Sequence, residues 1–267
     1  MLSFILLLPA AVPAQRSVAP GVSVHLPGPP SAVVPGLTSP ASLKILALRV
    51  AFEIDSNLST TGNGSFLMSL DSLSVGTVPC DAFLIDPPPH NSAYFQSQLQ
   101  ALANYYSTVT GGNIAIDMAG SQVFPATGEP LTVGPMASYT SNIIDDDSTA
   151  ALRVLLLEHA LAAAESAGAE PQTYDLVIIF HAGLGQDFNY QILDPTPRDI
   201  PSTFVSSDMI EQATGSAVLT LPSGTEFTRP ALIVPEGQNH IYYDIAFDIF
   251  FTQSDLCDVQ IGLTGTL

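Results

Sequence analysis

The chain has 267 residues, enough for one hydrophobic core of ordinary size or two small ones. Only 12% of the residues are charged, yet 6 Lys and Arg stand against 25 Asp and Glu, giving a formal net charge of −19 and an isoelectric point near 4.1. This imbalance argues against nucleic acid and anionic membrane surfaces as partners. Divalent cations, a saline medium, or simple solubility of a chain with a mean hydropathy of +0.34 are compatible with it, and solubility is favoured.

Residues 1–14 resemble a secretory signal peptide. An apolar run from Leu2 to Leu8 precedes small residues that suit cleavage after Ala14, although a basic start is missing. The alternative, a hydrophobic N-terminal strand, is disfavoured by Pro9 and Pro13. No later stretch offers the ~20 apolar residues of a membrane span. We therefore expect a secreted or otherwise exported protein, extracellular or periplasmic, with no membrane insertion after signal removal.

Residues 15–42 are rich in Pro, Ser, Val and Gly and are expected to form a linker or the remnant of a pro-segment. Order is predicted to begin at Leu43, and 43–267 to form one domain. The two cysteines, Cys80 and Cys257, could form a long-range disulfide in an oxidising compartment or remain two buried thiols. Sequence spacing does not decide between these alternatives.

The first predicted strand spans residues 43–52 and leads into a polar loop, 53–65, with a Gly62-Asn63-Gly64 turn. A helix is then predicted to begin at Asn91 or Ser92, either of which can cap it, and to end at Gly111-Gly112. One face of this helix carries apolar residues at helical spacing, namely Phe95, Leu99, Leu102 and Tyr106.

Two short strands, 113–118 and 131–133, are predicted before a second helix at about 148–167. Its N-terminal end carries Asp145, Asp146 and Asp147, which either bind calcium or, as we favour, interact with the positive end of the helix dipole. One face of the second helix is predicted to consist of Leu152, Leu156, His159 and Ala163.

The central strand is predicted at 174–185, where a β-branched apolar run ends in the polar turn His181-Ala182-Gly183. A strand buried on both faces needs helices above and below it, and the two predicted helices can supply them. Short strands follow at 204–205, 217–221 and 231–234, while 241–251 fits either a helix or a strand. The expected fold class is α/β (α+β), with a twisted mixed β-sheet and two main helices.

No complete catalytic motif is present in the 267 residues. The serine hydrolase motif G-x-S-x-G is absent, and Gly183-Leu184-Gly185 gives only part of a dinucleotide fingerprint, so an α/β hydrolase or nucleotide-binding enzyme lacks support. The zinc motif H-E-x-x-H is also absent, and no two histidines are spaced as ligands on one helix turn. His181 alone is expected to bind backbone at a strand end rather than a metal.

Two phrases resemble immune inhibitor A-type secreted zinc metallopeptidases. Residues 104–113, Asn-Tyr-Tyr-Ser-Thr-Val-Thr-Gly-Gly-Asn, resemble the end of the first helix in that family, and 174–183 resemble its strand leading to a His-Ala-Gly turn. Pro235-Glu236 resembles a further phrase that precedes the active-site helix. The resemblance runs in order from Leu43 to Leu267, and residues 258–267 resemble the lead-in to the zinc motif.

The resemblance implies that this chain is the N-terminal part of a secreted zinc endopeptidase with protein or peptide substrates. The fold would be the upper zincin subdomain, and an edge strand, either Ala231–Val234 or Ser202–Ser206, would pair with an extended substrate. The zinc ligands and the glutamate base would follow Leu267, so no catalytic or metal residue is named in this chain. The 267 residues alone are expected to be inactive. The alternative is a non-catalytic, secreted, peptidase-like binding or scaffold module.

Overall fold

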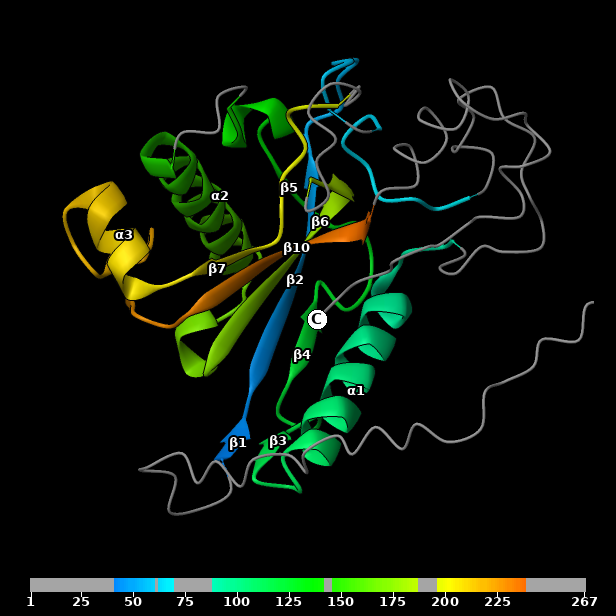
Figure 1. The fold of residues 1–267 in the computed structure, drawn as a ribbon, viewed down its shortest axis with the longest axis vertical. Helices are drawn as coiled ribbons and strands as arrows, with labels where there is room; N and C mark the ends of the chain where they lie inside the picture. Colours follow the sequence, from blue (N-terminus) through cyan, green and yellow to red (C-terminus); the bar gives the residue numbers. More distant parts are fainter. Residues whose placement is uncertain (1–40, 61, 70–87, 142–145, 187–195, 239–267) are drawn as a thin grey trace, which may run out of the picture. The chain divides into compact units, whose positions relative to one another are not determined.

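The computed structural model describes residues 41–60, 62–69, 88–141, 146–186 and 196–238 (Figure 1). The signal-like segment, Cys80, Cys257 and the ambiguous stretch 241–251 lie outside these ranges, as does all of the predicted linker except its last two residues. The predictions made for them therefore stay predictions.

A six-stranded mixed sheet forms the centre of the fold. Its strand order is β4-β2-β6-β10-β7, and β5 pairs with the end of β2 beyond β4. All pairings are parallel except that of β7 with β10, which is antiparallel. The strands are β2 (Ile45–Phe52), β4 (Gln122–Phe124), β5 (Leu131–Val133), β6 (Leu176–Gly185), β7 (Thr203–Val205) and β10 (Ala231–Gln238).

Within the described ranges, two small sheets accompany the main one. The short strand β1 (Ala41–Leu43) runs parallel to β3 (Ile114–Ile116). Strands β8 (Leu219–Thr220) and β9 (Glu226–Phe227) form an antiparallel pair. The mixed α+β architecture expected from the sequence is confirmed.

The described residues contain three α-helices and two short 3-10 helices. Helix α1 (Ser92–Val109) begins at Asn91, whose side-chain oxygen accepts the N–H groups of Ala93 and Tyr94, as an N-cap does. Helix α2 covers Asp146–Ser166, and α3 covers Ser207–Thr214. The 3-10 helices are η2 (Met136–Tyr139) and η3 (Pro171–Thr173).

The two long helices cover opposite faces of the main sheet. Phe180 of β6 stacks on Phe95 of α1, with ring centroids 4.6 Å apart. Its neighbour His181 points the other way and contacts Phe52 edge-on, on the face where Tyr139 contacts His159 of α2. Because successive strand residues face opposite sides, one helix lies on each side, as Figure 1 shows.

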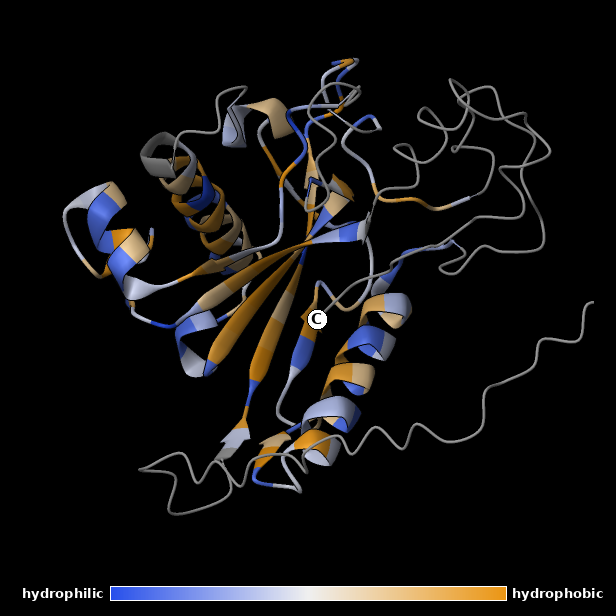
Figure 2. Cartoon of the chain, viewed as in Figure 1, coloured by the Kyte–Doolittle hydropathy of each residue, from blue (hydrophilic) through white to orange (hydrophobic). Residues whose placement is uncertain are grey.

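Burial on both faces explains the composition of the central strands. All eight residues of β2 are buried, and Figure 2 shows hydrophobic colour along β2, β6 and β10. The core therefore lies in two layers, one between the sheet and α1, the other between the sheet and α2. Both central strands that the sequence predicted are present.

The details differ from the prediction in three places. Strand β6 continues through the predicted turn to Gly185, because β10 pairs with it up to that residue. Tyr106 is partly exposed near the end of α1 and does not belong to its buried face. In α2, His159 is exposed, while the buried face includes Leu156, Leu157 and other residues, because apolar residues surround this helix on most sides.

Candidate functional site

A buried carboxylate lies where β6 and β10 lose register. The pairing slips by one residue between Pro235 and Gly237, and Gly183 opposite has a φ of +89°. The Gly183 N–H donates to Oε1 of Glu236 at 2.7 Å. Glu236 is only 7% exposed. Its side chain thus gives the bulged strand a hydrogen-bond acceptor where the backbone ladder is interrupted.

The second oxygen of Glu236 contacts two segments that lie much earlier in the sequence. Oε2 accepts the Leu67 N–H at 2.9 Å and lies 3.0 Å from Nδ1 of His90. The His90 ring stacks on Tyr94 with centroids 4.3 Å apart, and the Tyr94 hydroxyl donates to the Glu236 main-chain oxygen. One residue of β10 therefore ties together β6, the 62–69 segment and the start of α1.

This arrangement holds backbone segments in place and offers no accessible group for acid–base catalysis. The carboxylate of Glu236 is occupied by two main-chain N–H groups and a buried histidine, His90. A general base must come within reach of a substrate proton, and the Glu236 side chain is buried beneath its three contacts. We therefore assign Glu236 to holding the carboxyl ends of β6 and β10 in place.

The edge of the sheet beyond β10 is formed by β7. Thr203, Phe204 and Val205 pair with Ile233, Leu232 and Ala231 on one side, and among the described strands β7 has no partner on its other side. Val205 is buried, whereas Phe204 is 57% exposed. Of the two edge candidates from the sequence, the 202–206 segment lies at the edge, and 231–234 lies inside the sheet.

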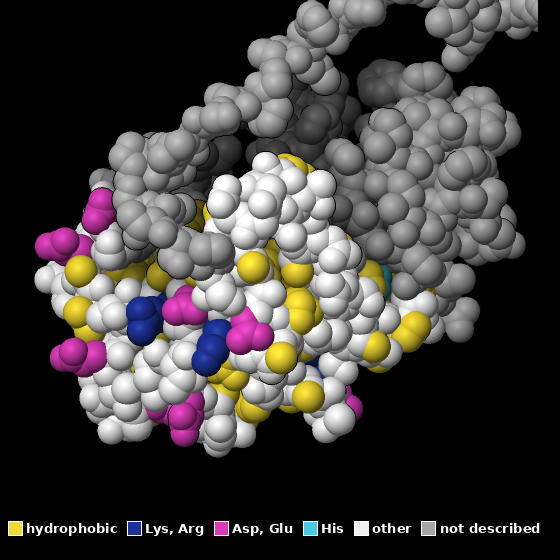
Figure 3. Space-filling model, turned by 90° about the horizontal axis from the view of Figure 1, so that it is seen from below, with side chains coloured by type: hydrophobic (Ala, Val, Ile, Leu, Met, Phe, Trp, Pro, Cys, Tyr) yellow, Lys and Arg dark blue, Asp and Glu magenta, His cyan; other side chains and the backbone are white. Residues whose placement is uncertain are grey.

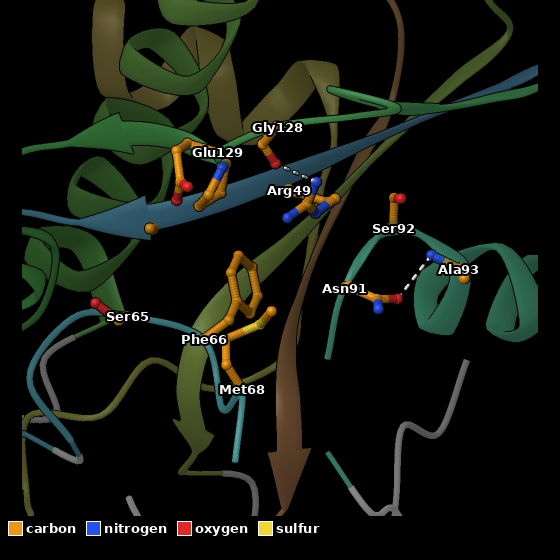
Figure 4. Close-up of a pocket in the computed structure, with 11 residues that line it drawn as sticks. Arg49, Ser65, Phe66, Met68, Asn91, Ser92, Ala93, Gly128 and Glu129 are labelled. Carbon is orange, nitrogen blue, oxygen red and sulfur yellow. Dashed lines mark hydrogen bonds between the residues drawn. The ribbon is translucent and has the colours of Figure 1, made fainter. Parts of the chain in front are cut away.

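A pocket of about 300 Å³ opens on the α1 face of the sheet, near the carboxyl end of β2. Four segments line it (Figure 4). They contribute Arg49 and Ala51 of β2, the residues Ser65, Phe66 and Met68, residues 91–93 at the start of α1, and residues 128–130. The Arg49 side chain lies at its inner end and is 4% exposed. Burial lowers the pKa of the Arg49 guanidinium, and the charge of Glu129 opposes this shift.

On the other face of the sheet, Tyr139 of η2 contacts α2. Its hydroxyl accepts the Gly134 N–H at 2.9 Å and lies 2.8 Å from Nδ1 of His159. Burial raises the pKa of Tyr139, the Gly134 hydrogen bond opposes the shift, and the charge of Glu53 adds to it. His181, also on this face, is buried with Nδ1 2.9 Å from the Ala182 carbonyl oxygen. This agrees with the expected backbone contact.

The residues proposed for calcium fall only partly within the structure. Helix α2 begins at Asp146, so the acidic run lies at its N-terminal end as expected, while Asp145 and the side chains of Asp146 and Asp147 lie outside the described part. Within the described ranges, no group of three His, Cys, Asp or Glu side chains is placed to hold a metal ion. Likewise, no described helix is both long and apolar enough to cross a membrane.

Sequence reasoning did not single out Glu236, His90 or Arg49 as site residues. Arg49 gave the clearest signal, since it is a cation inside an otherwise apolar strand. The pairing of His90 with Glu236 spans 146 residues and has no local signal. Comparison with known proteins adds no name, because no protein-family model matches the chain and no curated protein matches it.

Proposed function

We propose that this chain is the substrate-binding N-terminal part of a secreted zinc endopeptidase of the immune inhibitor A type. The observation that carries the proposal is the antiparallel edge strand β7, unpaired on its outer side among the described strands, on a sheet that is otherwise parallel. An extended peptide can add to such an edge by main-chain hydrogen bonds. The exposed Phe204 would contact the side chains of that peptide.

The two phrases behind the resemblance both lie in or beside regular elements of this fold. The 104–113 phrase covers the last turns of α1 and the two glycines that follow, both with positive φ. The 174–183 phrase enters and forms most of β6, the strand beside β10. The residues that would bind zinc and activate water are proposed to follow Leu267, so we assign no catalytic step to this chain.

Activity measurements on two forms of the gene product test the proposal. The 267-residue chain, loaded with zinc, should not hydrolyse denatured casein. A product extended in frame past Leu267 should carry H-E-x-x-H and hydrolyse casein, and a chelator should abolish the activity. Hydrolysis by the 267-residue chain, or an inactive zinc-loaded extended product, would contradict the proposal. Peptide binding without hydrolysis by the extended product would instead support the scaffold module.

A matched pair of substitutions tests the role of β7. Phe204 and Tyr105 are both 57% exposed, the first on β7 and the second on α1. In the extended product, Phe204→Ala should lower kcat/KM for casein at least about tenfold, since an apolar contact of this size is worth ~1.5–3 kcal/mol. Tyr105→Ala should leave kcat/KM unchanged. Equal effects of the two substitutions would remove the edge strand from the binding site.

A further inference from the structure

The Arg49 pocket is separate from the β7 edge. Arg49 lies on β2, and two strands, β6 and β10, stand between β2 and β7 in the sheet. Neither β7 nor β10 contributes a residue to the pocket wall. Anything bound there would therefore act independently of the proposed peptide edge.

Arg49 brings a positive charge into this pocket that no described carboxylate neutralises at ion-pair distance. Its NH1 group donates to the carbonyl oxygens of Pro125 and Gly128, at 3.0 and 3.3 Å. Its Nε atom is buried and has no hydrogen-bond partner in the described part of the chain. An arginine fixed by two carbonyl groups retains further N–H groups for an acceptor, and a buried donor without an acceptor is costly.

The start of α1 adds to the same positive field. Asn91, Ser92 and Ala93 line the pocket, and Figure 4 shows them across from Phe66 and Met68, with Arg49 between the two sides. The N-terminus of a helix carries a partial positive charge and favours anions. The side-chain oxygen of Asn91 is already bonded to the N–H groups of Ala93 and Tyr94, so a ligand would meet Arg49 first and the helix dipole second.

The remaining walls limit the kind of anion. Phe66, Met68 and Pro130 offer apolar surface, and Glu129 at the exposed rim repels a second negative charge. We propose that this pocket binds a small monocarboxylate with an apolar body, its carboxylate against the Arg49 guanidinium and the start of α1, and its apolar part against Phe66 and Met68. A dianion such as phosphate is disfavoured by Glu129.

Titration calorimetry of the 267-residue chain with phenylacetate tests the proposal. The expected result is saturable binding that 2-phenylethanol, a neutral molecule of similar shape, does not match. Asn91→Asp retains an equally good helix cap but places a negative charge in the pocket, and should weaken phenylacetate binding at least about tenfold. Glu129→Gln removes the rim charge and should tighten binding about threefold.

The control is Gln96→Glu, which adds the same charge to α1 on an exposed position outside the pocket wall. It should change phenylacetate binding less than about twofold. Three results would overturn the proposal, namely no saturable binding to the unsubstituted chain, equal binding of 2-phenylethanol, or equal effects of Asn91→Asp and Gln96→Glu. Circular dichroism of each variant establishes that the fold is retained, and the opposite signs expected for Asn91→Asp and Glu129→Gln exclude a general loss of structure.

Discussion

Glu236 shows how a single side chain can complete a sheet. The bulge between β6 and β10 directs the Gly183 N–H towards a side chain, and Leu67 N–H meets the other oxygen of the same carboxylate. Main-chain donors buried without an acceptor are expensive, so the carboxylate stabilises two backbone segments at once. Its contact with His90 brings the residues just before α1 to the same point.

Replacement of this carboxylate by an amide should be strongly destabilising. In Glu236→Gln, one oxygen is replaced by an NH2 group that faces a donor, so at least one buried N–H loses its acceptor. We expect the free energy of unfolding in urea at pH 7 to fall by about 2–4 kcal/mol. Glu129→Gln, the same change at an exposed position, should stay within about 0.5 kcal/mol. Similar values for the two variants would show that Glu236 is dispensable.

Tyr139 gives a pH dependence whose sign follows from its raised pKa. Below the unfolded value of about 10, both states hold the proton and the contribution to stability is complete. As the pH rises towards the higher folded pKa, the unfolded state loses its proton first, and stability falls. Tyr139→Phe should lose about 1–2 kcal/mol at pH 7, because the contacts with Gly134 and His159 disappear. Its stability should then fall less steeply than that of the unsubstituted chain above pH 10, measured by urea unfolding; parallel curves would contradict this.

Local signals predicted single residues well where a neighbour in sequence was the partner. Asn91 was recognised as a cap because the N–H groups that donate to its side-chain oxygen lie only two and three residues ahead. Glu236 and Arg49 were not recognised, since their partners lie 53 to 169 residues and 76 to 79 residues away, respectively. A charged residue that is buried by such distant contacts has the same neighbours in the sequence as a solvated one would have, so the sequence pattern does not tell them apart.

At the level of elements, periodicity succeeded for long segments with one clear buried face. Helix α1 and strands β2 and β6 were predicted close to their observed bounds. Helix α2 was found, but its predicted face matches the buried one only in part, since Leu156 is buried and His159 is exposed. A helix rich in Ala and Leu is apolar on several sides, and tertiary packing decides which side is covered. The 3-residue strand β4 and the 8-residue helix α3 were missed, since short elements give weak patterns.

Two glycines with positive φ differ in what an added Cβ would meet. At one, a side chain would only strain the backbone, and at the other it would also collide with neighbouring atoms. Gly215 ends α3 at φ +80°, and an added Cβ would meet nothing within 4 Å. Gly64 has φ +93°, and a Cβ there would lie 2.9 and 3.0 Å from the carbonyl oxygens of Glu53 and Phe52. We expect Gly215→Ala to cost about 1 kcal/mol and Gly64→Ala at least about 3 kcal/mol in urea unfolding, since the end of β2 must shift. Equal costs would mean that the loop after β2 adjusts freely.

At the scale of the whole molecule, the net charge is −19. The surface is more negative than this sum suggests, because several of the few cations are not at the surface. Arg49 and Arg153 are buried and Arg198 is half-buried, and all three donate to main-chain carbonyl oxygens. These arginines therefore stabilise loops while adding little positive charge to the surface. On the face drawn in Figure 3, acidic side chains are spread rather than gathered into one patch.

Spread negative charge should make stability depend on ionic strength. We expect the free energy of unfolding in urea to rise on the order of 1 kcal/mol between 10 and 300 mM NaCl, because screening weakens repulsion between exposed carboxylates. CaCl2 at matched ionic strength should give the same rise. A larger increase at submillimolar calcium, lost in Asp146→Asn with Asp147→Asn, would instead establish a calcium site at the start of α2.

The parallel sheet has a consequence for the order in which the chain can fold as it is synthesised. Strand β2 is synthesised early, yet the hydrogen-bond acceptors at its start are synthesised much later. The Ile45 N–H donates to Ser121, 76 residues further on, and the Lys44 N–H donates to Asp175, 131 residues further on. Strand β6 likewise pairs with β10, which is synthesised after it. An eight-residue apolar strand thus remains without its partners during most of translation, so slow refolding and losses to aggregation at high protein concentration are built into this topology.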